Sequence, residues 1–299
     1  MQNRIVVALI LSITAAIFFL TSCIGGNRPP NDDEVEVLIL MYHHITIEPE
    51  PENPSVISVG AFREQIETLY REGYSVVSFD DLIAFVDYGT ELPRRAVIIT
   101  FDDGHTSNLE FAAPILEEFG MSAIINIIGT QIGKSTYRHT YVRTIPHFAL
   151  EEVLSWVERG VIHIGHHTYD MHWVDWIEET WSGADLTIPF RRGVLPLADE
   201  THEEWRAAFI QDFEMLRDTI YRYLGVIVTV YAYPYGLFTA ETEEFLRELG
   251  VRVTLTTNPG INLVQQGNPN SLFALNRVNM EEDMTGTRLI RFLDSFFYE

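Results

Sequence analysis

The sequence predicts an α/β protein built around a parallel β-sheet. Short apolar, often β-branched runs alternate along the chain with stretches whose apolar residues recur at helical spacing. Roughly eight such runs follow residue 35, and this alternation is typical of βαβ units. The sheet is then either closed as a barrel or doubly wound. The glycine-rich phosphate fingerprint is missing from the sequence, which weighs against a dinucleotide-binding fold.

The expected strands are apolar runs that end in polar residues or turns. The run 96–101 is the clearest, because a β-branched run of this kind is typical of a strand buried on both faces. The expected strands are 35–41, 76–79, 96–101, 123–128, 161–165, 226–232, 251–255 and 272–275.

The expected helices are amphipathic, and three of them end at a glycine: Gly73, Gly120 or Gly160. The longest carries one apolar stripe, which predicts packing against the core. The expected helices are 62–70, 82–86, 109–119, 150–157, 205–223 and 242–249. The segment 175–200 has no clear period, and we expect an inserted loop that lines the substrate cleft.

The first 34 residues are expected to form a lipoprotein leader and a tether. Arg4 precedes an apolar run at 5–20, which is short for a membrane-spanning helix of roughly 20 residues. Leu20-Thr21-Ser22-Cys23 has the form of a bacterial lipobox. We therefore expect a signal peptide at 1–22, lipidation of Cys23, a flexible tether at 23–34 and one folded domain at 35–299. A lipidated chain would lie at the extracytoplasmic face of the cell membrane. An uncleaved anchor and a plain secreted protein are the alternatives.

Composition limits the classes of function. The chain has 299 residues, 46% of them apolar, which is enough for a full core. The 20 basic and 43 acidic residues give a net charge of −23, which argues against nucleic acid as a partner. Cys23 is the only cysteine, so neither an intrachain disulfide nor a cysteine-based zinc site can form.

Polar side chains follow four of the expected strands, at the end where parallel α/β barrels carry their functional groups. These groups are Tyr42-His43-His44, Asp102-Asp103, His166-His167 with His172, and Tyr233-Pro234-Tyr235-Gly236. Each group alone is compatible with a turn or an ordinary surface segment. Together they suit a divalent metal, since one aspartate and two histidines leave a coordination position open. The second aspartate of the pair is then free to act as a base.

These motifs resemble those of the NodB-homology polysaccharide deacetylases, carbohydrate esterase family 4. The first family motif, Thr-Phe-Asp-Asp-Gly, is intact at 100–104, the second matches His167-Thr168 with His172, and the third matches Pro234-Tyr235-Gly236. The opening Leu40-Met41-Tyr42-His43-His44-Ile45 is most similar to the branch that contains biofilm poly-N-acetylglucosamine deacetylases. The resemblance covers essentially all of the chain after the tether. It implies a distorted (β/α) barrel of about seven to eight parallel strands.

The resemblance also implies roles for individual residues. Asp103, His167 and His172 are expected to bind a divalent metal, with zinc expected first and cobalt, nickel or manganese as alternatives. Asp102 is expected to be the base, and the backbone N–H of Tyr235 to hold the oxyanion. The residues expected to contact substrate are Tyr42, His43, His44, Pro234 and Arg277, with Trp173 and Trp176 as further aromatics for stacking on sugar rings.

Three features depart from the usual family pattern. The two histidines of the second motif are five residues apart, whereas much of the family has them four apart. The biofilm branch is similar to this chain in this respect. Ala232 stands where an arginine usually orients the base. The last strand, Leu275-Asn276-Arg277-Val278, has no histidine to serve as general acid. His43, His44 or water at the metal are the alternatives for the acid, and Arg277 is a candidate to orient the base.

The expected activity is metal-dependent removal of N-acetyl groups from an N-acetylglucosamine-containing envelope or extracellular polysaccharide, with release of acetate. One alternative is an O-acetyl esterase of the acetylxylan type, for which a missing acid would matter less. The other is a catalytically silent glycan-binding lipoprotein, against which the intact Asp102-Asp103 pair argues. The expected partners are the acetylated glycan and, through Cys23, the membrane. No protein partner is implied.

Overall fold

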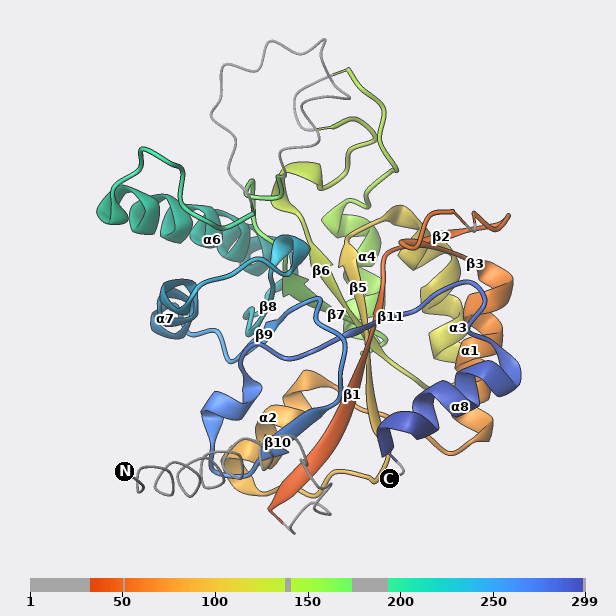
Figure 1. Cartoon of the computed structure of the whole chain (residues 1–299). Helices are drawn as coiled ribbons and strands as arrows, with labels where there is room; N and C mark the ends of the chain where they lie inside the picture. The colour runs from red at the N-terminus through yellow and green to blue at the C-terminus, as the bar shows by residue number, and fades with distance from the viewer. Residues whose placement is uncertain (1–32, 51, 138–140, 174–192, 298–299) are drawn as a thin grey trace, which may run out of the picture.

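A curved, mostly parallel sheet organises the protein (Figure 1). The computed structural model describes residues 33–50, 52–137, 141–173 and 193–297. The sheet runs in the order β10-β1-β5-β6-β7-β8-β9, with β4 beside β5 and β11 beside β1. Its strands are β1 Glu34–Tyr42, β4 Ser75–Val76, β5 Ala96–Asp103, β6 Ala123–Ile127, β7 Ile162–His166, β8 Val230–Ala232, β9 Val253–Leu255, β10 Asn262–Gln265 and β11 Val278–Asn279.

Every strand pairing in this sheet is parallel except that of β10, which runs antiparallel to β1. The path ends at β9 on one side and at β10 on the other, so the sheet forms a half-barrel. The predicted distorted barrel of parallel strands is therefore confirmed. A separate two-stranded parallel sheet pairs β2 (His44–Thr46) with β3 (Val56–Ser58).

Helices cover both faces of the sheet, which explains why its strands are continuously apolar. Side chains of β1 alternate between two clusters: Leu38 and Leu40 join one, and Val37 and Ile39 the other. The first cluster contains side chains of α1 Val59–Arg71, α3 Ala113–Glu118, α4 Leu150–Glu158, α6 His202–Leu224 and α8 Gly286–Phe297. The second contains those of α2 Phe79–Tyr88, and Figure 1 shows α1, α3 and α8 grouped away from α2. A third cluster packs α6 against α7 (Ala240–Glu248).

Glycines end several helices as predicted. Gly73, Gly120 and Gly160 have φ values of 73°, 63° and 72°, the left-handed conformation that favours glycine after a helix. The segment expected as the helix 109–119 divides into a π-helical turn, η1 Asn108–Ala112, followed by α3.

Two expected strands are wrong or partly wrong. Phe79 begins α2 instead of ending a strand, because Ser78 and Asp81 form a capping box at the start of that helix. The segment 272–275 holds the end of a 3-10 helix, η4 Pro269–Leu272, and Leu275 makes only an isolated bridge with Leu255. A proline at the start of η4 favours the helical turn over a strand.

Other elements were not expected or lie elsewhere than expected. The run 226–232 is a strand only over β8, the last strand expected at 275–278 is instead β11, and β2, β3, β10 and α8 were not expected. Residues 175–192 of the expected cleft loop lie outside the residues that the structure describes. The expected signal peptide, Cys23 and most of the expected tether also lie outside the described residues. Within the described part of the chain, no helix is both long and apolar enough to span a bilayer.

Candidate active site

The ends of β5, β7 and β8 bring the predicted site residues together. Asp102 and Asp103 close β5, His167 follows β7, and Tyr235 follows β8 in a 3-10 turn, η3 Pro234–Gly236. Adjacent parallel pairing of β5, β6, β7 and β8 places these ends along one edge of the sheet. The strand-end position expected for functional groups is the one that the structure has.

Asp103, His167 and His172 converge as a candidate metal-binding group. Asp103 Oδ1 lies 3.7 Å from His167 Nε2 and 3.5 Å from His172 Nε2. One ligand atom from each of the three residues lies within 4.8 Å of the others. Two imidazole nitrogens and one carboxylate oxygen are a donor set that divalent zinc accepts with a position left open.

The orientation of the two rings also suits a metal. His167 Nδ1 donates to the carbonyl of Ala232 at 2.8 Å, which leaves the unprotonated Nε2 facing Asp103. His172 Nδ1 lies 3.0 Å from the hydroxyl of Tyr235, so its Nε2 likewise faces Asp103. The residues present therefore fit the metal that the motif implies.

Asp102 is buried beside this group and paired with Arg277. Arg277 donates from Nη1 to Asp102 Oδ1 at 2.8 Å and from Nη2 to Oδ2 at 2.7 Å. Asn126 Nδ2 donates to the same Oδ1 at 2.8 Å. Burial alone would raise the pKa of Asp102, but the Arg277 guanidinium and the His167 ring outweigh it and hold the pKa well below its usual range. Asp102 is therefore a carboxylate, as a base must be.

Arg277 occupies the orienting role that was considered for it, and the substrate contact expected for it is wrong. Its side chain is fully buried and it donates from Nε to the carbonyl of Thr256 at 2.7 Å. The family arginine missing at Ala232 thus has a counterpart directly before β11. In place of that arginine side chain, Ala232 contributes its carbonyl, which orients His167.

Tyr42 and Pro234 are further corrections among the expected substrate contacts. Side chains alternate along a strand, and Tyr42 lies on the core side, stacked on Phe101, while His43 lies on the cleft side. The hydroxyl of Tyr42 donates to Gln65 at 2.8 Å and is not available to a substrate. Pro234 is buried at the start of η3.

His43 and His44 do line a cleft of about 580 Å³ that opens over Asp102, Asp103, His167 and His172. Its lining includes residues 53–56, before and within β3, and also Tyr137, Thr144, Ile145 and His147. This volume is in the range of pockets that bind small ligands. Trp173 packs against Tyr137 at the edge of this region, and Trp176 lies outside the described residues.

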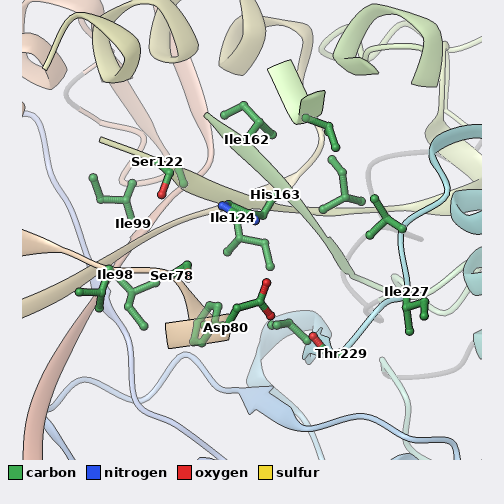
Figure 2. Close-up of a pocket in the computed structure, with 17 residues that line it drawn as sticks. Ser78, Asp80, Ile98, Ile99, Ser122, Ile124, Ile162, His163, Ile227 and Thr229 are labelled. Carbon is green, nitrogen blue, oxygen red and sulfur yellow. The ribbon is translucent and has the colours of Figure 1, made fainter. Parts of the chain in front are cut away.

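A second, smaller cavity lies toward the opposite ends of the strands (Figure 2). Ile98, Ile124, Ile162 and Thr229 are among its lining residues, and its volume is about 100 Å³. It is far below the roughly 300 Å³ of typical ligand pockets and carries none of the predicted site residues.

Strained backbone marks the site. Five non-glycine residues among those described have positive φ, and three of them are Asp103 (76°), Thr168 (70°) and Tyr235 (57°). Each such residue costs on the order of 1–3 kcal/mol, and such residues cluster at functional sites. Asp103 ends β5, and Thr168 and Tyr235 lie within three residues of the ends of β7 and β8.

The segment between the two histidines is held from α6. Asp212 accepts hydrogen bonds from the backbone N–H groups of Tyr169 (2.8 Å) and Asp170 (2.6 Å). His166 Nε2 lies 3.1 Å from the carbonyl of Phe213, the next residue of the same helix. The backbone between His167 and His172 is therefore held in place by a helix that was expected only to fill the core.

Sequence reasoning missed Asn126, His105 and Asp212. Asn126 is a lone amide within a buried apolar strand, which is a signal that was available. His105 directly follows the Thr-Phe-Asp-Asp-Gly motif. Asp212 lies in an ordinary helical pattern and carries no local signal.

The half-barrel and the acid–imidazole group at its strand ends together define a hydrolase of the deacetylase class. A model of the polysaccharide deacetylase family matches residues 89–254, more than half of the chain. The chain therefore belongs to the polysaccharide deacetylase family. Arg277, which pairs with Asp102, lies beyond the matched segment.

Individual relatives and solved structures agree with this assignment. YxkH of Bacillus subtilis (strain 168), classed as a polysaccharide deacetylase, is 24% identical over 86% of this chain and 76% of its own length. The poly-beta-1,6-N-acetyl-D-glucosamine N-deacetylase of Escherichia coli (strain K12) is 25% identical over 84% of this chain, but the match spans only 40% of that protein. A de-N-acetylase from Aggregatibacter actinomycetemcomitans has a TM-score of 0.69 at 19% identity, covering 86% of this chain and 99% of that chain. IcaB from Ammonifex degensii has a TM-score of 0.67 at 22% identity, covering 87% and 97%, and these two structures support the fold.

Proposed function

We propose that this polysaccharide deacetylase removes N-acetyl groups from an N-acetylglucosamine-containing polysaccharide of the cell envelope or extracellular matrix and releases acetate. The observation that carries the proposal is the convergence of Asp103, His167 and His172 beside the ionised Asp102. The Escherichia coli relative, a poly-beta-1,6-N-acetyl-D-glucosamine N-deacetylase, supports the choice of substrate.

Asp103, His167 and His172 would hold a divalent metal, zinc first and cobalt, nickel or manganese as alternatives. When bound there, such an ion would polarise the acetyl carbonyl and lower the pKa of water. The protein supplies the orientation of the three ligand atoms, through the Ala232 carbonyl for His167 and the Tyr235 hydroxyl for His172.

Asp102 would take the proton from the attacking water, and its hydrogen bonds indicate which oxygen does so. Oδ1 already accepts from both Arg277 and Asn126, whereas Oδ2 accepts from Arg277 alone. A carboxylate oxygen has about two acceptor sites, so Oδ2 has one to spare. We propose Asp102 Oδ2 as the base atom.

The backbone N–H of Tyr235 would stabilise the oxyanion that forms as water attacks the acetyl carbon. The left-handed conformation of Tyr235 sets the direction of this N–H at the rim of the cleft. Loss of one such donor typically costs about 3 kcal/mol of transition-state stabilisation.

His43 is the better candidate to protonate the leaving amine. It lines the cleft, and its ionisation is influenced by both Asp103 and Asp102, which places it near the reacting groups. Its Nδ1 has no hydrogen-bond partner within the described residues, whereas His44 Nδ1 lies 2.8 Å from the hydroxyl of Ser107. Burial, the largest influence, lowers the pKa of His43, so the resting ring is neutral. To act as the acid, it would first have to take up a proton, such as the one that Asp102 removes from water.

A substrate panel with acetate detection tests the proposed function. The enzyme is stripped with a chelator, reloaded with zinc or cobalt, and assayed on N-acetylglucosamine oligomers and on acetylxylan. We expect acetate from the oligomers, only with metal present. Acetate from acetylxylan alone would identify an O-acetyl esterase. No metal uptake and no acetate from either substrate would overturn the proposal.

We also propose that the chain is anchored by a lipid on Cys23 at the extracytoplasmic face of the membrane. The support is the lipobox pattern at 20–23. Cys23→Ala should move the protein from the membrane fraction to the soluble fraction of cells. Unchanged fractionation of the variant would contradict lipid anchoring.

A further inference from the structure

The two carboxylate oxygens of Asp103 have different neighbours. Oδ1 faces His167 and His172, the two candidate imidazole ligands. Oδ2 lies 3.3 Å from Nε2 of His105, within hydrogen-bond distance of that ring, and, against the opposing effect of burial, the interaction with His105 helps to hold the pKa of Asp103 well below its usual range. Asp103 thus has one oxygen, Oδ1, that faces the proposed metal position, and another, Oδ2, that faces the ring of His105.

We propose that His105 is a positioning residue for the metal site, which holds Asp103 Oδ2 and so leaves Oδ1 as the only ligand oxygen of that carboxylate. The proposal deepens the function proposed above and rests on it. His105 lines the cleft but lies outside the candidate ligand group, and the role proposed for it is exerted through Asp103.

The ring of His105 is fixed on several sides. It is only 5% exposed, and its centroid lies 4.7 Å from that of His147 and 5.3 Å from that of His44. The backbone of His105 bridges that of His147. A ring held this firmly can direct its N–H at one oxygen atom.

The proton on His105 is also assigned by its surroundings. Nδ1 has no hydrogen-bond partner in the described part of the chain, whereas Nε2 faces a carboxylate oxygen. A carboxylate only accepts, so the neutral ring carries its proton on Nε2 and donates it to Asp103. His105 is not itself a ligand by geometry, since among the described residues the group with ligand atoms within 4.8 Å comprises Asp103, His167 and His172 alone.

This hydrogen bond has a consequence for coordination. A free carboxylate can turn and bind a metal through both oxygens, which would take up a position needed for water and the acetyl group. With Oδ2 bound to His105, Asp103 contributes one oxygen only. Outer partners of this kind typically change metal affinity about 10- to 100-fold.

The test compares three substitutions at His105 in the full chain. His105→Gln retains an amide N–H that reaches toward Oδ2, His105→Asn is too short to reach it, and His105→Ala has no donor. His163→Gln is the matched control, because His163 is a β7 histidine on the small cavity away from the site (Figure 2). Each protein is stripped of metal, titrated with Zn²⁺ against a chromophoric chelator, and loaded with Co²⁺ for its visible absorption spectrum.

We expect His105→Ala and His105→Asn to raise the Zn²⁺ dissociation constant at least about 10-fold. Their Co²⁺ bands should weaken, as coordination number rises when Asp103 binds through both oxygens. His105→Gln should restore most of the affinity and the wild-type spectrum, and His163→Gln should change neither. A cooperative thermal unfolding transition shows that each variant is folded. If His105→Ala does not fold, the comparison of His105→Gln with His105→Asn tests the role of His105.

Two outcomes would overturn the role of His105. One is a wild-type Co²⁺ spectrum and Zn²⁺ affinity in the Ala and Asn variants. The other is a Gln variant as impaired as the Asn variant, since ring packing and not the hydrogen bond would then matter. Failure of the wild-type chain itself to bind Zn²⁺ or Co²⁺ would instead remove the proposed function, and the inference with it.

Discussion

Arg277 holds both carboxylate oxygens of Asp102 with paired hydrogen bonds of 2.8 and 2.7 Å, in a part of the core where neither side chain is more than 2% exposed. The guanidinium fork matches the carboxylate, and this geometry fixes the carboxylate plane as well as its charge. Arg277 therefore keeps Asp102, the proposed base, ionised and oriented, while its own side chain stays buried.

Replacing Arg277 should strongly destabilise the protein. Arg277→Met leaves Asp102 buried without a counter-charge, and removal of one partner from a buried pair typically costs about 3–5 kcal/mol of unfolding free energy. Arg277→Lys keeps the charge but loses the fork, so we expect a smaller loss. Urea unfolding measures both. In the double variant with Asp102→Asn, much of the Met penalty should disappear; purely additive losses would show that the two side chains do not interact.

Asp102→Asn should abolish most turnover while leaving metal in place. The amide cannot accept the proton of water, and loss of a general base typically lowers the rate about 10²- to 10⁴-fold. Acetate release and metal content of the same preparation measure the two effects. A variant with wild-type turnover would show that another group is the base, and a metal-free variant would show that Asp102 is needed for binding.

Asp212→Ala should loosen the segment that carries both histidines. Two backbone N–H groups lose a charged acceptor, and each such bond is typically worth about 1.5–3 kcal/mol. Asp212→Asn keeps one acceptor oxygen and should lose less. Unfolding free energy and Zn²⁺ affinity should fall together. A loss of stability with unchanged Zn²⁺ affinity would mean that Asp212 supports the fold but does not set the positions of the His167 and His172 side chains.

The metal-free protein should become less stable as the pH falls from about 6.5 toward 4. Burial, with a smaller contribution from His105, lowers the pKa of both His44 and His147 to about 4. The unfolded chain takes up protons at these residues near pH 6.5 while the folded chain does not, so acid favours unfolding. For His147 the slope is at most about 1.4 kcal/mol per pH unit. His147→Gln should flatten the dependence of unfolding free energy on pH, and an unchanged slope would contradict the assignment.

The parts of the fold that could be predicted depend on local signals. The buried run that became β5 and the glycines after α1, α3 and α4 each carry their own signature, and the structure agrees with them. The segment at 272–275 was misassigned because a short apolar run fits a strand as well as a 3-10 turn, and Pro269 decides between them. Tyr42 was placed on the wrong face because two adjacent residues of a strand point to opposite sides, and composition alone does not say which side faces the cleft.

The site shows the same division. Asp102, Asp103, His167 and His172 fall in compact motifs, so their meeting point could be anticipated from strand ends. The partners that orient them are remote in the sequence: Arg277 follows β9 and β10, and Asp212 lies within α6. Such pairings depend on the assembled half-barrel, and a motif of a few residues contains no information about them.

The late position of Arg277 in the sequence has a consequence for how the site forms as the chain is synthesised. A chain grows from its N-terminus, so Asp103, His167 and His172 are all made well before Arg277. Until the segment that leads into β11 settles against β1, Asp102 has no cationic partner and little reason to stay buried and ionised. Completion of the fold and ionisation of the proposed base Asp102 thus depend on the same late segment of the chain. A polypeptide that stops short of Arg277 would carry every proposed metal ligand yet lack the cation that pairs with Asp102.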